Sequence, residues 1–288
     1  MTWKGVAWAA GVLVIIAVAI GAGVWVHSED RTAGDTWHSI GTEAPDRVDV
    51  DATVQKVDAV AREVTLRVFV VPRGRFGEHD GLAPTGTLTL LNSSSLRGDQ
   101  TFPAHERIAS TDLPIALTGG AVTDYPFDGY GSHIQFAAEE DGKPVPVLLT
   151  LDTVDSLFSL AVTGSDRSGG LDVRFTRATS VLVYALFMMF AMWAIAVAVA
   201  LGAWRLIFRR RGLVWSAFGF MAASLFALAS FRDAAPGSPP IGTLLDYTAF
   251  LWAELVVALS VFASVVAGAV AERLASRHHD SRKRGGAP

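Results

Sequence analysis

The sequence predicts a multi-pass membrane protein with four transmembrane α-helices and an extracytoplasmic antiparallel β-sandwich domain. Two observations lead to this fold class. Four long apolar blocks account for a hydrophobic content of 51% over 288 residues and for a mean hydropathy of +0.36. Between the first and second blocks, residues 27–179 are polar, and apolar side chains recur there with a period of two, as they do in half-buried strands.

The apolar blocks cover residues 5–26, 181–203, 213–231 and 244–270. The first has 22 residues, which at the helical rise extend roughly 33 Å and suffice to cross a bilayer. Because a backbone in lipid needs internal hydrogen bonds, each block is predicted as a helix. A cleaved signal peptide is the alternative for the first block, but its apolar run exceeds the usual signal core, so we favour an uncleaved anchor.

The distribution of cations predicts the orientation in the membrane. Lys4 precedes the first block. The second block is followed by Arg205 and by the three arginines of residues 209–211, and five Lys and Arg residues lie in residues 273–288. Since short cytoplasmic segments are enriched in Lys and Arg, we expect both termini in the cytoplasm and residues 27–179 outside. That exterior segment holds 13 Lys and Arg against 23 Asp and Glu. The basic tail suits anionic lipid headgroups or serves as a topology signal alone.

These features divide the chain into five predicted parts. They are an N-terminal transmembrane anchor (1–26), a polar linker (27–46), the β-domain (47–179), a three-helix transmembrane domain (180–272) and a basic cytoplasmic tail (273–288). The chain contains no cysteine. The exterior domain must therefore be held by its own hydrophobic core rather than by disulfides.

The exterior domain reads as a series of short strands. Apolar and polar residues alternate strictly over residues 48–55, which predicts a half-buried strand. Runs rich in Val, Leu, Phe and Thr predict further strands at residues 64–71, 87–91, 132–137, 145–151, 157–162 and 171–175. Asp141-Gly142 has the composition of a hairpin turn. Short strands separated by turn residues indicate an antiparallel β-sandwich.

The exterior domain lacks a recognisable catalytic or cofactor motif. Asp49, Asp51 and Asp58 do not have the spacing of a calcium loop and are interpreted as the solvent-exposed face of a strand. The histidines lack the close spacing of zinc motifs, no Gly-rich loop opens a helix, and Ser132 is not in a nucleophile elbow. We expect no metal, no cofactor and no nucleic acid, and we favour a non-enzymatic protein.

Tyr125, Pro126, Phe127 and Asp128 form the most distinctive exterior motif. Proline presets a turn, the aromatic rings can anchor it in a core, and the carboxylate can accept backbone hydrogen bonds. The four residues resemble the Phe-Pro-Phe-Asp type of loop that pentameric ligand-gated channels place between their β-sandwich and their pore helices. The resemblance implies a gating loop. The alternative, which we favour, is an ordinary packed turn.

Glu254 lies inside the fourth apolar block, near the bilayer midplane if the helix begins between residues 244 and 247. An ionised carboxylate at that depth is costly, so it must be protonated, paired or facing a polar cavity. Proton or ion handling is one interpretation. The other is an interhelical hydrogen bond, or an ion pair with Arg232 at the end of the third block.

Two further groups of residues are predicted to shape the helical part. Small residues recur at every fourth position of the fourth block and allow close helix packing; they are Ser260, Ser264 and Gly268. The exterior loop before this block is stiffened by prolines, and an acid stands at the entrance to the helix; these residues are Pro236, Gly237, Pro239, Pro240 and Asp246.

Three motifs together resemble an actinobacterial membrane-protein family known only as a domain of unknown function. They lie at residues 125–128, 236–242 and 246–252. The resemblance covers residues 48–270. It implies one helix, an exterior β-domain and three helices in a bacterial plasma (inner) membrane, and it implies no activity, cofactor or catalytic residue.

We consider three functional hypotheses. The first is a non-enzymatic binding, scaffold or accessory subunit of the cell envelope, anchored in the lipid bilayer, whose exterior β-domain binds other envelope or membrane proteins or a ligand; an oligomer is compatible with it. The alternative is a channel or transporter component that uses Glu254. The third is an enzyme acting on envelope lipids, with a site built from residues far apart in the sequence.

Overall fold

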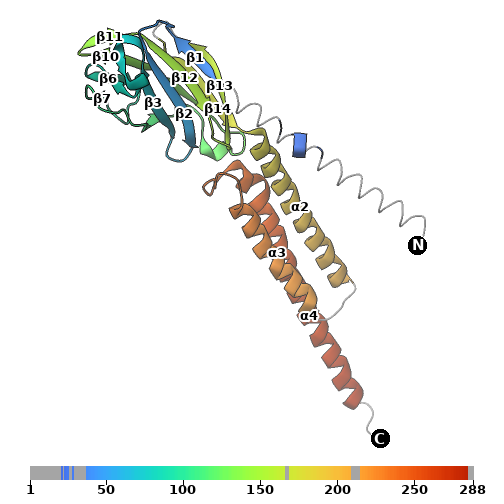
Figure 1. The fold of residues 1–288 in the computed structure, drawn as a ribbon. Helices are drawn as coiled ribbons and strands as arrows, with labels where there is room; N and C mark the ends of the chain where they lie inside the picture. Colours follow the sequence, from blue (N-terminus) through green and yellow to red (C-terminus); the bar gives the residue numbers. More distant parts are fainter. Residues whose placement is uncertain are drawn as a thin grey trace. The chain divides into compact units, whose positions relative to one another are not determined.

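The computed structural model describes residues 21, 23–25, 28, 37–165, 169–208 and 215–284, with side chains as far as Arg273. The chain divides into two compact units, and the boundary falls between Leu182 and Val183. The N-terminal unit contains the strands and the second unit contains nearly all of the described helical residues (Figure 1). The predicted first transmembrane helix, residues 5–26, lies almost entirely outside the described residues.

The β-domain is built from short strands linked by tight turns and short 3₁₀ helices. The strands are β1 (His38–Gly41), β2 (Val48–Asp58), β3 (Glu63–Pro72), β4 (Gly77–Glu78), β5 (Ala83–Pro84), β6 (Leu88–Asn92), β7 (Gln100–Phe102), β8 (Thr111–Ala116), β9 (Gly129–Ile134), β10 (Phe136–Glu140), β11 (Lys143–Val145), β12 (Val147–Thr153), β13 (Phe158–Ser165) and β14 (Leu171–Arg177). The 3₁₀ helices are η1 (Gly74–Phe76), η2 (His79–Gly81) and η3 (Val122–Asp124).

The described strands form four sheets. The largest has the order β1-β12-β2-β3-β8, and the others have the orders β11-β10-β6-β7, β13-β14-β9 and β4-β5. Alternating side chains of β2 point inward, and Val48, Val50 and Val54 are fully buried. They share one hydrophobic core with residues of the second and third sheets such as Leu90 and Phe175. The core therefore holds the three larger sheets together.

Most predicted strands are present, with two corrections to their extents. Strands β2, β3, β6, β13 and β14 lie where the sequence places them. The predicted strand 132–137 is divided into β9 and β10, and the predicted strand 145–151 is divided into β11 and β12 at Pro146. Asp141 and Gly142 join β10 to β11 with φ of 49° and 76°, the left-handed geometry that hairpin turns require.

The predicted purely antiparallel sandwich is wrong. Strand β2 pairs with β12 in parallel, with Val50 opposite Leu149, so the largest sheet is mixed. Two of its strands were not predicted. Strand β1 lies within the predicted linker, and β8 contains Pro114, which an edge strand tolerates because its outer side needs no amide donor.

The helical part of the chain consists of α2 (Thr179–Phe208), α3 (Trp215–Asp233), the π-helical turn η4 (Asp246–Phe250) and α4 (Leu251–Arg284). Each helix buries one stripe of residues. On α2 this stripe recurs every three or four residues and includes Met188, Met192 and Val199, as expected for helix packing.

The predicted number of four transmembrane helices is also wrong. In the part of the chain that the structure describes, two helices are long and apolar enough to cross a membrane, Thr179–Phe208 and Asp246–Arg273. Helix α3 has 19 residues. Its serines, Gly219 and Arg232 reduce its apolar character, which explains why an apolar block in the sequence does not amount to a membrane-crossing helix.

Asp58 holds the turn between β2 and β3 and gives a pH-dependent contribution to stability. Its carboxylate accepts hydrogen bonds from the amides of Ala61 (2.9 Å) and Val60 (3.1 Å) and from Lys56 (2.7 Å). The Ala61 amide and the Lys56 ammonium hold the pKa of Asp58 below its usual value of 3.8. A lowered folded-state pKa contributes stability above the unfolded-state pKa, and this contribution is lost as the pH falls through the folded-state value.

We therefore expect Asp58→Asn to reduce the pH dependence of unfolding below about pH 4. The wild type should have the higher free energy of unfolding at neutral pH, and its difference from the variant should shrink as the pH falls through this range. Asp124→Asn is the control, because Asp124 is exposed. An unchanged difference between wild type and Asp58→Asn from pH 6 to pH 3 would show that the capping carboxylate does not titrate as expected.

Candidate functional site

The predicted turn at residues 125–128 lies at the end of the sheet β13-β14-β9. Strand β9 begins directly after the turn, where Gly129 pairs with Thr176 near the end of β14. Tyr125 and Pro126 are buried and joined by a cis peptide bond. Phe127, in contrast, is 57% exposed. The turn is thus packed on one side and presents an aromatic ring on the other.

A buried ion pair fixes this turn to the last residue of β14. Arg177 donates from Nε to Asp128 Oδ1 and from Nη2 to Asp128 Oδ2, both at 2.9 Å. The side chains are 5% and 0% exposed. Tyr130 donates its hydroxyl to Asp128 Oδ2 at 3.0 Å. Burial and the Asp128 carboxylate raise the pKa of the Tyr130 phenol, so Tyr130 remains a donor throughout the neutral range.

Aromatic rings enclose the Arg177 guanidinium. It lies 4.1 Å from the ring centre of Phe158 and 5.1 Å from that of Tyr125, and Tyr130 meets Phe158 edge-on at 6.0 Å. Both geometries are favourable for a buried cation. Because Thr179 begins α2, this cluster stands where the chain leaves the β-domain.

Sequence reasoning found the turn but missed Arg177. The structure shows a packed turn; whether it acts as a gating loop stays a prediction. Arg177 lies immediately before a long apolar helix, at the end opposite to the Arg-rich segment. Cations are less common at that end of a membrane helix, and this was the signal in the sequence for a buried partner.

A second buried ion pair lies between α3 and η4. Arg232 donates from Nε to Asp246 Oδ1 at 3.0 Å, and the side chains are 10% and 2% exposed. Arg232 Nη2 also donates to the carbonyl oxygens of Pro239 and Pro240 at 3.1 and 2.8 Å. One guanidinium therefore binds both the helix entrance and the loop before it.

Asp246, the first residue of η4, binds amides at the start of the helical segment formed by η4 and α4. Its Oδ2 accepts the amides of Gly242 (2.7 Å) and Thr243 (3.0 Å), which the helix itself cannot satisfy. Within the loop, Gly237 and Ser238 have φ of 76° and 45° and turn the chain beside the buried Pro239. Pro236 is half-buried. The predicted loop residues and Asp246 are thus joined into one unit with Arg232.

The alternative ion pair between Arg232 and Glu254 is wrong, because Arg232 is bound to Asp246. Glu254 is half-buried on α4, and its carboxylate forms no side-chain hydrogen bond or ion pair with any described residue. Its proposed role in proton or ion handling stays a prediction.

The small residues of α4 are placed unequally. Ser264 and Gly268 are buried, whereas Ser260 is half-buried and donates to the Val256 carbonyl at 2.7 Å. The Ser264 hydroxyl has no hydrogen-bond partner among the described residues. This stripe lies on the same face as Ala253 and Val257, which are fully buried.

The acidic residues of β2 differ in their surroundings. In the described residues, no group of three or more His, Asp or Glu side chains is arranged to hold a metal ion. The prediction that all three acids lie on a solvent-exposed face needs one correction. Asp49 is buried, and its carboxylate binds Arg47 and Arg73 at 2.6 and 2.8 Å. Asp51 is exposed as expected.

Two of the described helices are long and apolar enough to cross a membrane, which indicates a membrane-associated protein with a β-rich domain. Residues 38–177 match the family described as "Domain of unknown function (DUF4436)", and residues 177–271 match "Domain of unknown function (DUF8686)". The two matches are consistent with the uncharacterised domain family that the motifs of the chain resemble. No curated protein matches the chain.

Proposed function

We propose that the protein is a non-enzymatic accessory or scaffold subunit of the bacterial cell envelope, whose β-domain binds a protein partner outside the cytoplasm. One observation carries the proposal. Internal ion pairs engage the charged residues that are buried in the described part of the chain, namely Asp49, Asp128, Arg232 and Asp246, and also the buried side chain of Arg177. Carboxylates whose oxygens are occupied by internal partners are structural parts of the fold rather than groups free to contact a substrate.

The distribution of cations around α2 supports an exterior β-domain. Arg205 lies in the last turn of α2, and residues 209–211 are three consecutive arginines. Cations concentrated at one end of a spanning helix favour the cytoplasm for that end. The β-domain precedes the other end, so we place it outside the plasma membrane.

The exposed ring of Phe127 is the best candidate contact for a partner. The buried Tyr125 and the Asp128–Arg177 pair hold the turn on either side of it. A large apolar side chain on a rigid support loses little conformational entropy on binding, and aromatic residues, Phe among them, are enriched in the cores of protein interfaces. We therefore assign Phe127 to the interaction surface of the β-domain.

The test replaces Phe127 with a photo-crosslinking amino acid in the full-length chain, irradiated in native membranes. Leu96 is the matched control. Leu96 is 52% exposed and lies shortly after Asn92, the last residue of β6. Asn92 pairs with Phe136, which follows the far end of β9, whereas Phe127 precedes the start of β9. We expect a protein adduct from position 127 and none from position 96. No adduct at either position, together with a monomeric purified protein, would refute the accessory role.

A second candidate function is a channel or transporter component, favoured by the Glu254 carboxylate of α4, which has no side-chain partner among the described residues. The acid is costly in an apolar environment unless it meets a proton, an ion or another subunit. In liposomes containing the full-length protein, Glu254→Gln should abolish a pH-dependent ion flux while Glu272→Gln preserves it. A wild-type protein without any flux above that of empty liposomes would exclude this function.

A further inference from the structure

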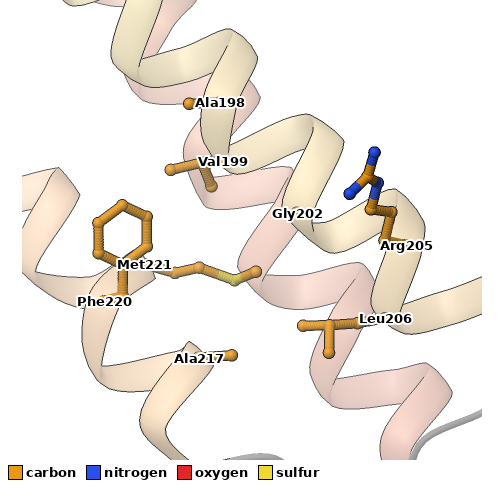
Figure 2. A pocket seen from close by; sticks show the side chains of 8 residues that line it. All are labelled: Ala198, Val199, Gly202, Arg205, Leu206, Ala217, Phe220 and Met221. Carbon is orange, nitrogen blue, oxygen red and sulfur yellow. The ribbon is translucent and has the colours of Figure 1, made fainter. Parts of the chain in front are cut away.

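An apolar groove of about 310 Å³ lies between α2 and α3. Small residues line it on both helices, namely Ala198, Gly202 and Ala217. Met221 and Phe220 of α3 form one wall, and Figure 2 shows Met221 extending from α3 toward α2. Arg205 is the one charged residue among those that line the groove.

Gly202 leaves open space on the α2 side of the groove. A Cβ placed there would meet no heavy atom within 4 Å, so space remains that a larger residue would fill. Because an apolar cavity offers water no hydrogen-bond partners, water is a poor occupant. In a membrane, the acyl chain of a lipid is the apolar molecule present at the highest concentration.

The residues around the groove place its Arg205 end at the membrane surface. The rings of Trp204 and Phe208 are in contact, with their centres 4.1 Å apart, and both are exposed, as is Trp215 at the start of α3. Exposed Trp residues are typical of the headgroup level of a bilayer. In the sequence, Arg205 is followed by the arginines of residues 209–211.

We propose that this groove binds an anionic phospholipid, with one acyl chain along Gly202 and the phosphate at Arg205. A guanidinium is suited to phosphate recognition, and clustered arginines at the end of a membrane helix attract anionic headgroups. The inference goes beyond the accessory role. It rests on the membrane insertion of α2 that the proposed function includes.

The first arm of the test measures selectivity for the headgroup. The full-length protein in mild detergent is titrated with dioleoyl phosphatidylglycerol or dioleoyl phosphatidylcholine, and bound lipid is counted by native mass spectrometry. We expect phosphatidylglycerol to bind more tightly, and Arg205→Gln to weaken its binding about five-fold, the effect of one cation near a membrane surface. Equal binding of the two lipids by the wild type, unchanged in Arg205→Gln, would overturn the proposal.

The second arm fills the groove. Gly202→Leu should abolish phosphatidylglycerol retention, because the new side chain occupies the acyl-chain space. Gly219→Leu on α3 is the matched control, since a Cβ there also meets no heavy atom within 4 Å and Gly219 does not line the groove. Equal lipid retention in both variants would overturn the proposal. So would a disulfide-linked dimer of Gly202→Cys in the otherwise cysteine-free chain, because a second copy would then occupy the groove.

Alkaline carbonate extraction of the membranes separates this inference from the function on which it rests. Release of the wild-type protein would refute the membrane insertion and the lipid site together. Retention of the protein without lipid selectivity would refute the lipid site alone.

Discussion

Replacing Arg232 with alanine is expected to lower the free energy of unfolding of the helical unit by about 3–5 kcal/mol, the usual cost of removing one partner from a buried ion pair. The Asp246 carboxylate would lose its counter-ion while remaining buried. The carbonyl oxygens of Pro239 and Pro240 would lose their shared donor. Asp246→Asn should cost less, because an amide oxygen can still accept the Gly242 and Thr243 amides.

Tryptophan fluorescence of the full-length protein in mild detergent is a suitable measurement. The indoles of Trp193 and Trp252 donate to the carbonyl oxygens of Thr248 and Tyr247, so they report on η4 directly. Asp233→Asn is the matched control, since Asp233 neighbours Arg232 in the sequence and is exposed. If Arg232→Ala unfolded at the same denaturant concentration as Asp233→Asn, the pair would have no role in stability.

Arg177→Ala is expected to destabilise the β-domain by a similar amount, about 3–5 kcal/mol. The change removes both hydrogen bonds to Asp128 and leaves this carboxylate, whose side chain is 0% exposed, with Tyr130 alone. It also removes the cation from the faces of Phe158 and Tyr125. Arg177→Lys should recover part of the loss, because an ammonium supplies the charge without the two-pronged geometry.

Hydrogen exchange of the full-length protein localises this effect. Amides of β9 and β14 should exchange faster in Arg177→Ala, while those of β2 and β3 in the largest sheet change less. Arg174→Ala is the matched control, because Arg174 lies on β14 three residues before Arg177 and is exposed. Equal exchange in the two variants would show that the Asp128–Arg177 pair does not hold the turn.

Several elements were predictable from local pattern alone. Strand β2 follows from the alternation of Val and polar residues, because the side chains of a strand point to opposite faces in turn. The hairpin at Asp141-Gly142 follows from residues that tolerate positive φ. The turn at residues 125–128 and the proline loop were found for the same reason, since proline and glycine restrict or permit backbone conformations locally.

Other elements depended on partners that are remote in the sequence. The parallel pairing of β2 with β12 joins segments almost 100 residues apart, and periodicity within a strand carries no information about its neighbour. Strand β8 was not predicted because it contains Pro114. Strand β1 was not predicted because its segment is polar, which its position at the edge of the sheet tolerates. The apolar block at residues 213–231 was not apolar enough to be a membrane-crossing helix, and only its helical conformation was predicted correctly.

The sequence by itself determined that the chain combines a β-rich domain with long apolar helices, because hydropathy and its period depend on the local backbone. Only the tertiary structure decided which charges are neutralised. It paired Asp246 with Arg232 instead of leaving that arginine for Glu254, buried Asp49 between two arginines, and brought Arg177 to Asp128. The physical reason is that an ion pair depends on distance in space, and distance between residues far apart in the chain is set by packing.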